Sequence, residues 1–264
     1  MATGQPYPQI QVLERGNILF LYQPKSTVAH AQGADDLQAI YFMLLPDERE
    51  QHKSRIFAVP RGLFPVLVPG SAAPEERAWA FAQEVHPDPR VALDSLQEEA
   101  MAALAPGQRA RPWVRAAGEG RYTIVKHGAD THLAYVLDKP EQPGEVQQAL
   151  KIAPRGNYLI SVLAPAAPAE IKVDRRPTYP PRLQSRFRDD RAPVEPSDFL
   201  DYPYTRVFLL AAGLDAEQEL GVKLEPNIQN WAQRKALQML HKEETKAASE
   251  GISLLEPLME GRWA

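Results

Sequence analysis

The sequence predicts an α+β fold, a mostly antiparallel sheet assembly with helices between its strands and a helix near the C-terminus. Three observations favour this class. Short apolar segments alternate with polar residues, as in half-buried strands. Turn residues and 25 prolines in 264 residues, above the usual share of about one in twenty, separate these segments. Apolar residues recur at helical spacing in only two regions, over 74–104 and 227–249.

Residues 9–104 predict a β-rich unit with a helical segment. Side chains alternate over 9–25 on both sides of Arg15-Gly16-Asn17. Because glycine and asparagine tolerate positive φ angles, we expect a hairpin there. Strands are expected at 37–45 and 55–60, and a helix over 74–104 that His86-Pro87-Asp88-Pro89 divides in two.

Residues 112–164 predict a second β-rich unit. It has strands at 121–126 and 131–137 around a turn, a helical turn at 144–150 and a strand at 158–163. Three of its strands end in segments like those of the first unit, offset by 94 to 105 residues. Two explanations remain open: a duplicated three-strand unit, and chance similarity between two β-rich stretches.

The last 100 residues divide into a strap and a C-terminal region. Residues 165–206 hold eight prolines and little periodicity, so we expect an extended strap over the surface. Residues 207–264 predict a strand at 207–212 and the clearest helix of the chain at 227–249. The four segments together are compatible with one compact domain.

Composition excludes several classes of protein. The chain has 44% hydrophobic and 24% charged residues, the mix of a globular protein rather than a fibrous or disordered one. Without cysteine it has no thiolate zinc site, iron–sulfur cluster, disulfide or cysteine nucleophile. A net charge of -4 gives no global attraction to nucleic acid or anionic lipid. No apolar run approaches the roughly 20 residues that span a bilayer, and residues 1–8 do not resemble a signal peptide. We therefore expect a cytoplasmic protein that does not bind membranes.

One turn carries a candidate metal site. His127, Asp130 and His132 lie within six residues, and imidazole and carboxylate groups are ligands for zinc, manganese or iron. A metal-bound water there would make the protein a metal-dependent hydrolase. The alternative is a polar turn whose histidines face solvent or bind the backbone. The enzyme signatures of a P-loop, a dinucleotide fingerprint, a nucleophile elbow and a zinc-protease helix are absent from the sequence.

The strap carries a cluster of candidate binding residues. Its arginines could pair with phosphate or carboxylate groups, and Tyr179 and Phe187 lie among them as potential stacking partners for bases; the arginines are Arg175, Arg176, Arg182, Arg186 and Arg188. Single-stranded nucleic-acid binding is one interpretation. The other is a strap attached by ion pairs to the acidic body of its own chain.

Five short stretches resemble an uncharacterised bacterial protein family; they are Gly16-Asn17-Ile18, Tyr22-Gln23-Pro24-Lys25, His127–Tyr135, Pro143–Gln147 and Phe199–Tyr202. The resemblance covers most of 9–212. It implies a bacterial cytoplasmic protein and brings no activity or catalytic residue with it. At Gln23 the family pattern has arginine.

The absent catalytic signatures and the long strap favour a non-enzymatic binding or accessory protein without a cofactor. We expect it to engage a protein partner through its strap and its C-terminal helix, where Trp231 is of the residue type enriched at interfaces. The metal-dependent hydrolase and the nucleic-acid-binding strap remain the alternatives.

Overall fold

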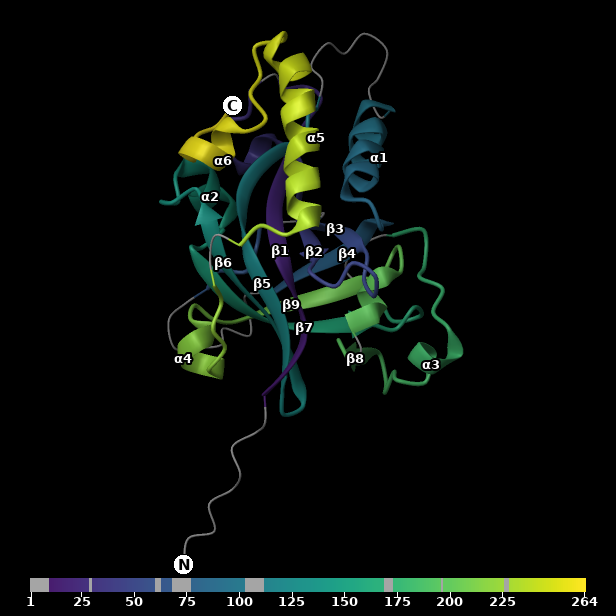
Figure 1. Ribbon diagram of the computed structural model, residues 1–264. Helices are drawn as coiled ribbons and strands as arrows, with labels where there is room; N and C mark the ends of the chain where they lie inside the picture. Colours follow the sequence, from purple (N-terminus) through teal and green to yellow (C-terminus); the bar gives the residue numbers. More distant parts are fainter. Residues whose placement is uncertain are drawn as a thin grey trace, which may run out of the picture.

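Closure of the sheet is the feature that decides the fold. The computed structural model describes residues 10–28, 30–59, 63–67, 77–102, 112–168, 173–195, 197–225 and 228–264. Its strands form one antiparallel sheet in the order β6-β5-β1-β2-β3-β4-β9-β7-β8, and β6 pairs with β7 as well. This last pairing closes eight strands into a barrel, with β8 as an extra strand beside β7. The predicted α+β class is therefore wrong, because the protein is a mainly β closed barrel with helices on its outside (Figure 1).

The described chain contains nine strands, six helices and two 3-10 turns. The strands are β1 (Ile10–Pro24), β2 (Leu37–Pro46), β3 (Ser54–Val59), β4 (Arg77–His86), β5 (Arg115–His127), β6 (Asp130–Lys139), β7 (Arg155–Leu163), β8 (Arg191–Pro193) and β9 (Arg206–Gly213). The helices are α1 (Pro89–Ala102), α2 (Glu145–Leu150), α3 (Pro181–Gln184), α4 (Ala216–Leu220), α5 (Trp231–Ala248) and α6 (Glu256–Glu260), with 3-10 turns η1 (Ala34–Asp36) and η2 (Ser197–Asp201).

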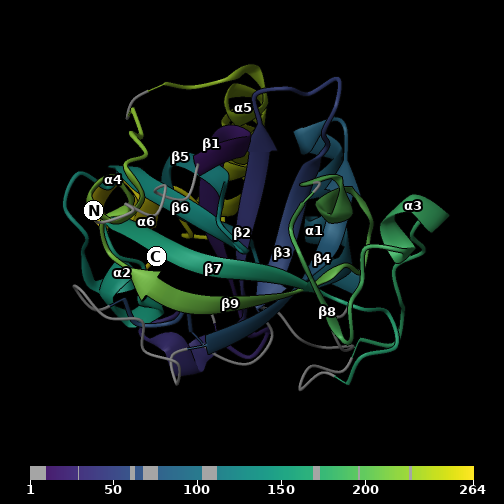
Figure 2. The ribbon, with the colours of Figure 1, turned by 90° about the horizontal axis from the view of Figure 1, so that it is seen from below.

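Two four-strand meanders make up the barrel. β1–β2–β3–β4 form one and β5–β6–β7–β9 the other, and the pairs β1–β5 and β4–β9 join them. Seen from below, β7 and β9 cross in front of β2 and β3 (Figure 2). The two β-rich units expected at 9–104 and 112–164 thus share one sheet, because β1 pairs directly with β5 along most of its length.

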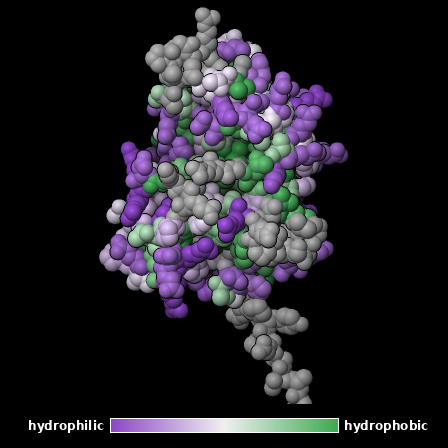
Figure 3. Space-filling view, turned by 180° about the vertical axis from the view of Figure 1, so that it is seen from behind, coloured by the Kyte–Doolittle hydropathy of each residue, from purple (hydrophilic) through white to green (hydrophobic). Residues whose placement is uncertain are grey.

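Side chains alternate between the barrel interior and its outer face, as the period of a strand requires. Phe20, Phe42, Phe57 and Tyr135 belong to the interior core. The outer faces of β1, β2 and β3 form a second core with α1, α5 and α6, and Figure 1 shows α1 and α5 side by side over this part of the barrel. From behind, polar residues cover most of the surface and hydrophobic ones appear around its middle (Figure 3).

The hairpin expected around Arg15-Gly16-Asn17 is wrong, since β1 runs without interruption through these residues. Gly16 serves close packing instead of a turn. A Cβ atom on it would lie 2.3 Å from the Leu45 carbonyl oxygen and 2.7 Å from the Tyr122 ring. The glycine therefore lets β1 approach both neighbouring strands.

The prediction of a helix over 74–104 is wrong for its first part and confirmed for its second. Residues 77–86 form β4, while α1 begins at Pro89 as the proline-rich break predicts. Ala80 and Ala82 of β4 face the interior core, and Trp79 and Phe81 pack on the outer face. A strand covered on both faces loses its alternation, so an apolar run of this kind resembles a helix. The ends of the expected helix at 74–76 and 103–104 lie outside the described residues.

The strap is not an extended arm on the surface, because its described part packs into the barrel core. Tyr179, Leu183, Val194 and Phe199 are each at most 2% exposed and belong to the interior cluster. Aromatic contacts join Tyr179 to Phe187 and Phe199, with ring centroids 5.6 and 5.3 Å apart. Bulky apolar residues among the prolines, rather than periodicity, were the signal for this packing.

Replacing Gly16 by alanine is expected to destabilise the barrel. The new methyl group would contact backbone that cannot move independently, and overpacking of this kind costs about 1–3 kcal/mol or more. Urea unfolding measures the change. Gly33→Ala is the matched control, since a Cβ at Gly33 has no atom within 4 Å; equal stability of the two variants would contradict the packing role of Gly16.

Replacing Glu84 on β4 by glutamine is expected to stabilise the protein in a pH-dependent way. Burial, together with the charge of Glu99, raises the pKa of Glu84 to about 7 from 4.5. The ionised form therefore weakens the folded state, progressively as pH rises from 4.5 and fully above 7. Glu84→Gln should be more stable than the natural protein in thermal unfolding at pH 8, and this difference should shrink toward pH 5. Glu98→Gln, on the exposed face of α1, is the control, and a pH-independent difference for Glu84→Gln would contradict the assignment.

Candidate functional site

The first residues of β1 have a neighbouring strand on one side only. Ile10, Gln11 and Val12 pair with β5, whereas pairing with β2 begins at Gly16. Leu13 is an extra residue that forms a bulge, because Val12 and Glu14 pair with adjacent residues of β5. Among the described residues, no strand pairs with the other side of Ile10–Glu14, which we call the open edge. The backbone groups of such an edge are a template for another chain.

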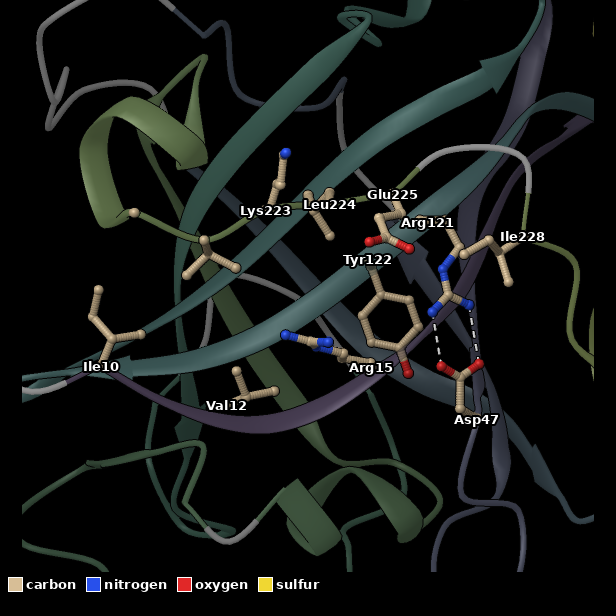
Figure 4. Close-up of a pocket in the computed structure, with 12 residues that line it drawn as sticks. Ile10, Val12, Arg15, Asp47, Arg121, Tyr122, Lys223, Leu224, Glu225 and Ile228 are labelled. Carbon is tan, nitrogen blue, oxygen red and sulfur yellow. Dashed lines mark hydrogen bonds and ion pairs between the residues drawn. The ribbon is translucent and has the colours of Figure 1, made fainter.

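An outer pocket of about 570 Å³ lies on one side of the open edge. Ile10, Val12 and Ile228 line it and are 40–46% exposed, and they are three of the five exposed large hydrophobic residues in the described part of the chain. Figure 4 shows the side chain of Arg15 between these strand residues and the segment Lys223–Glu225. The pocket thus combines an apolar surface with basic side chains.

One ion pair fixes the far wall of the outer pocket. Arg121 donates two hydrogen bonds to Asp47, of 3.0 and 2.7 Å, drawn as dashed lines in Figure 4. Burial alone would raise the pKa of Asp47, but hydrogen bonds from Arg121 and Asn230 hold it below its ordinary value. Both carboxylate oxygens of Asp47 are thereby occupied. The exposed charged groups that remain in the lining are the cations Arg15 and Lys223 and the carboxylate of Glu225.

An inner pocket of about 450 Å³ lies on the other side of the open edge. Its walls are Gln11, Val12 and Leu13 of β1, Gln51 and His52 of the β2–β3 loop, and Glu195, Ser197 and Asp198 of the strap. Val12 lines both pockets. The open edge therefore runs between two cavities, one on each face of the sheet.

A buried charge network lies behind the inner pocket. Arg55 of β3 is 0% exposed and donates to both carboxylate oxygens of Glu14, at 2.6 and 3.1 Å. Its Nε atom donates to Asp201 at 2.8 Å, and the Tyr122 hydroxyl donates to Glu14 at 2.5 Å. The carboxylates of Glu14 and Asp201 thus both bind the guanidinium of Arg55, which connects β1, β3 and the strap.

The pKa values reflect this mutual stabilisation. Burial opposes the charged form of Arg55, but the charges of Glu14 and Asp201 raise its pKa above the ordinary value. Burial likewise opposes ionisation of Asp201, yet a hydrogen bond from His52 and the charge of Arg55 lower its pKa. Both groups are therefore charged at neutral pH, despite their burial.

His52 connects this network to the inner pocket. Its Nδ1 atom lies 3.1 Å from Asp201 Oδ2, and its Nε2 atom lies 3.4 Å from the Ser197 hydroxyl oxygen. Burial lowers the pKa of His52, but the hydrogen bond to Asp201 and the charge of Glu14 raise it above its ordinary value overall. In the sequence His52 lies among polar residues, between Gln51 and Lys53, with no pattern that indicates a site. The one signal for the network was a charged residue, Arg55, at the start of an apolar strand.

The expected metal ligands are only partly brought together. His127 and Asp130 form the last pair of the β5–β6 hairpin, which confirms the predicted turn, and the His127 and His132 rings are 6.1 Å apart. His132 hydrogen-bonds Asn157 at 3.0 Å, and burial lowers its pKa. The described residues contain no group of three or more histidine, aspartate or glutamate side chains placed to hold a metal ion.

Most of the candidate arginines of the strap contact their own chain. Arg182 pairs with Asp198 at 2.5 Å, and Arg186 with the Glu195 carbonyl at 3.2 Å. Arg175 donates to the Tyr204 hydroxyl at 2.5 Å, and the backbone of Arg188 forms a bridge with Arg191, whereas Arg176 has only a repulsive interaction, with Arg206. These partners all belong to the strap itself, so the contacts brace the strap internally. The ion pairs that attach it to the barrel use strap carboxylates instead, Glu195 with Lys126 and Asp201 with Arg55.

Trp231 lies at the start of α5, half-buried against the outer core. The guanidinium of Arg49 lies 4.8 Å from the centre of its ring. Trp231 is therefore engaged within the chain and lies outside both pockets of the open edge.

The fold and the site define a class: a closed antiparallel β-barrel with an open strand edge between two pockets. Comparison with known proteins adds no relative, since no family model, curated protein or solved structure matches the chain. In the part of the chain that the structure describes, none of the helices has the length and apolar character needed to cross a membrane.

Removing the central cation of the buried network should destabilise the protein. Arg55→Met leaves Glu14 and Asp201 buried without their partner, and the loss of one member of a buried ion pair costs about 3–5 kcal/mol. Urea unfolding at pH 7 measures the loss, and Arg55→Met combined with Glu14→Gln should recover part of it. A single variant as stable as the natural protein would contradict the network's role.

Proposed function

We propose that this protein is a binding protein that takes up an extended segment of a partner protein as an additional strand along the open edge of β1. The observation that carries the proposal is that Val12 lines two pockets, of which one also takes Ile10 and the other takes Gln11 and Leu13. A bound strand satisfies the unpaired backbone groups of the edge, as in other cases of β-strand addition.

The geometry of a strand suggests the sequence of the partner. Successive side chains of a strand point to opposite faces, so a bound segment would direct alternate residues into the outer and inner pockets. The outer pocket presents Ile10, Val12 and Ile228, and its exposed charged groups are Arg15, Lys223 and Glu225. It therefore favours apolar side chains and, with two exposed cations to one exposed carboxylate, acidic ones over basic ones. The inner pocket, with Gln11, Gln51 and Ser197 among its walls, favours small polar side chains.

Of the two regions expected to engage a partner, the strap lines one of these pockets, whereas α5 lines neither and only the segment before it takes part. The strap supplies Glu195, Ser197 and Asp198 to the inner pocket, and the segment before α5 supplies Lys223, Leu224 and Ile228 to the outer pocket. The strap's arginines then serve to hold the wall in place, since Arg182 and Arg186 contact Asp198 and Glu195. A cytoplasmic location for this binding remains a prediction from composition.

Selection from a random library of displayed peptides tests the proposal. Selected peptides should share alternating apolar or acidic positions, and their affinity is then measured by fluorescence polarisation. Val12→Asp should weaken binding at least about tenfold, equivalent to about 1.4 kcal/mol, because it introduces a charge between the two pockets and repels acidic peptide residues. Amide hydrogen exchange of 10–14 should slow on binding.

Val91→Asp is the matched control, since Val91 on α1 is 43% exposed and Val12 is 42% exposed. It should leave the affinity unchanged. Peptides that bind both variants equally, or that protect amides elsewhere and not those of 10–14, would refute strand addition at this edge.

A further inference from the structure

Two side chains of the inner pocket, Ser197 and His52, lie in line with Asp201 behind it, in the order of a nucleophile, a base and an orienting acid. We propose that Ser197, His52 and Asp201 form a hydrolytic site for neutral carboxylic esters, with Ser197 as the nucleophile. The Ser197 oxygen lies 3.4 Å from His52 Nε2, and His52 Nδ1 lies 3.1 Å from Asp201 Oδ2. Activation of a serine hydroxyl needs a base within reach and a third group that orients the base.

Asp201 is fixed more firmly than a surface carboxylate. Its Oδ1 atom accepts hydrogen bonds from the backbone N–H of Lys53 at 2.9 Å and from Arg55 Nε at 2.8 Å. Its Oδ2 atom is thereby directed at His52. With Asp201 accepting at Nδ1, the His52 tautomer has its proton on Nδ1, and Nε2 is available to accept the Ser197 proton.

The elements that carry the three residues are close in space though distant in sequence. Ser197 and Asp201 are the first and last residues of the same 3-10 turn, η2. His52 precedes β3, which starts at Ser54. Arg55, which lies in β3 three residues after His52, binds both Asp201 and Glu14. The buried network thus positions the base as well as stabilising the fold.

The inner pocket gives a substrate access to this site and selects for neutral molecules. Both His52 and Ser197 line it. The other charged groups in its walls are already paired, Glu195 with Lys126 at 2.7 Å and Asp198 with Arg182 at 2.5 Å. With Leu13 and Val12 on the opposite wall, the pocket of about 450 Å³ fits a short acyl group.

The reaction balances without any further reactant besides water. Ser197 Oγ attacks the ester carbonyl carbon while its proton passes to His52 Nε2. The tetrahedral intermediate collapses, the bond from carbon to the leaving oxygen breaks, and His52 returns the proton to the departing alcohol. Water then attacks the acyl-serine with His52 as base, which releases the carboxylic acid and restores Ser197.

Labelling with a fluorophosphonate probe tests the site on the full chain. Peptide mapping by mass spectrometry should find the probe on Ser197. Ser197→Ala should remove the label, and His52→Gln should slow labelling at least about a hundredfold, as expected when a general base is lost. Ser185→Ala, which removes an exposed strap serine, is the matched control and should label at the natural rate.

The pH dependence distinguishes an activated serine from a structural one. His52 must be neutral to accept a proton, so the labelling rate should rise with pH through the His52 pKa. That pKa lies above the ordinary histidine value, because Asp201 and Glu14 face the ring and outweigh burial and the charge of Arg55. Hydrolysis of p-nitrophenyl acetate should follow the same profile and be lost in Ser197→Ala.

Two results would overturn the site: folded natural protein that stays unlabelled at Ser197, and labelling of Ser197 that His52→Gln does not slow. The outcome is separate from strand addition, since protection of the amides of 10–14 by a bound peptide is measured on the natural protein and does not depend on labelling at Ser197.

Discussion

One buried cation constrains the whole arrangement. The buried guanidinium of Arg55 is stable only with Glu14 and Asp201 as its partners, and these carboxylates in turn would be buried without a cation if Arg55 were displaced. These partners come from the first strand and from the strap, so the guanidinium determines where both ends of the network lie. The bulge at Leu13, the position of η2 and the orientation of His52 are all consistent with this single requirement. Neutralisation of one charge thus links the interior of the barrel to the pocket at its surface.

Barrel closure removes most of the strand edges that open sheets expose. Among the described residues, β8 and the start of β1 each have a neighbouring strand on one side only. β1 and β5 continue beyond the point where β2 ends, so the first five residues of β1 keep an unpaired side. A bulge, two cavities and a buried charge cluster all lie beside this segment. Bulges are frequent next to functional sites because they redirect side chains. The features that support binding and those that support ester hydrolysis therefore share one end of the molecule.

The sequence predicts local structure well where local signals mark the ends of an element. The β5–β6 hairpin, α5 and the strands β2 and β3 were expected near their observed positions, because their turns, caps or bounding prolines are explicit. β1 and β4 were misread, since Gly16 resembles a turn residue and β4 is covered on both faces. Closure depends on pairs such as β4–β9, which no local pattern records. For the same reason His52, Ser197 and Asp201 could not be associated before the fold was known.

The connectivity of the barrel also has a consequence for its assembly on the ribosome. β4 finds its second neighbour only in β9, more than 120 residues later. Until that strand emerges, the first meander is an open sheet. Its edge strand, β4, is unpaired on one side and rich in alanine, tryptophan and phenylalanine. Nascent chains of this protein should thus be exposed to mispairing during almost half of their synthesis, and a chaperone that covers β4 would reduce that exposure.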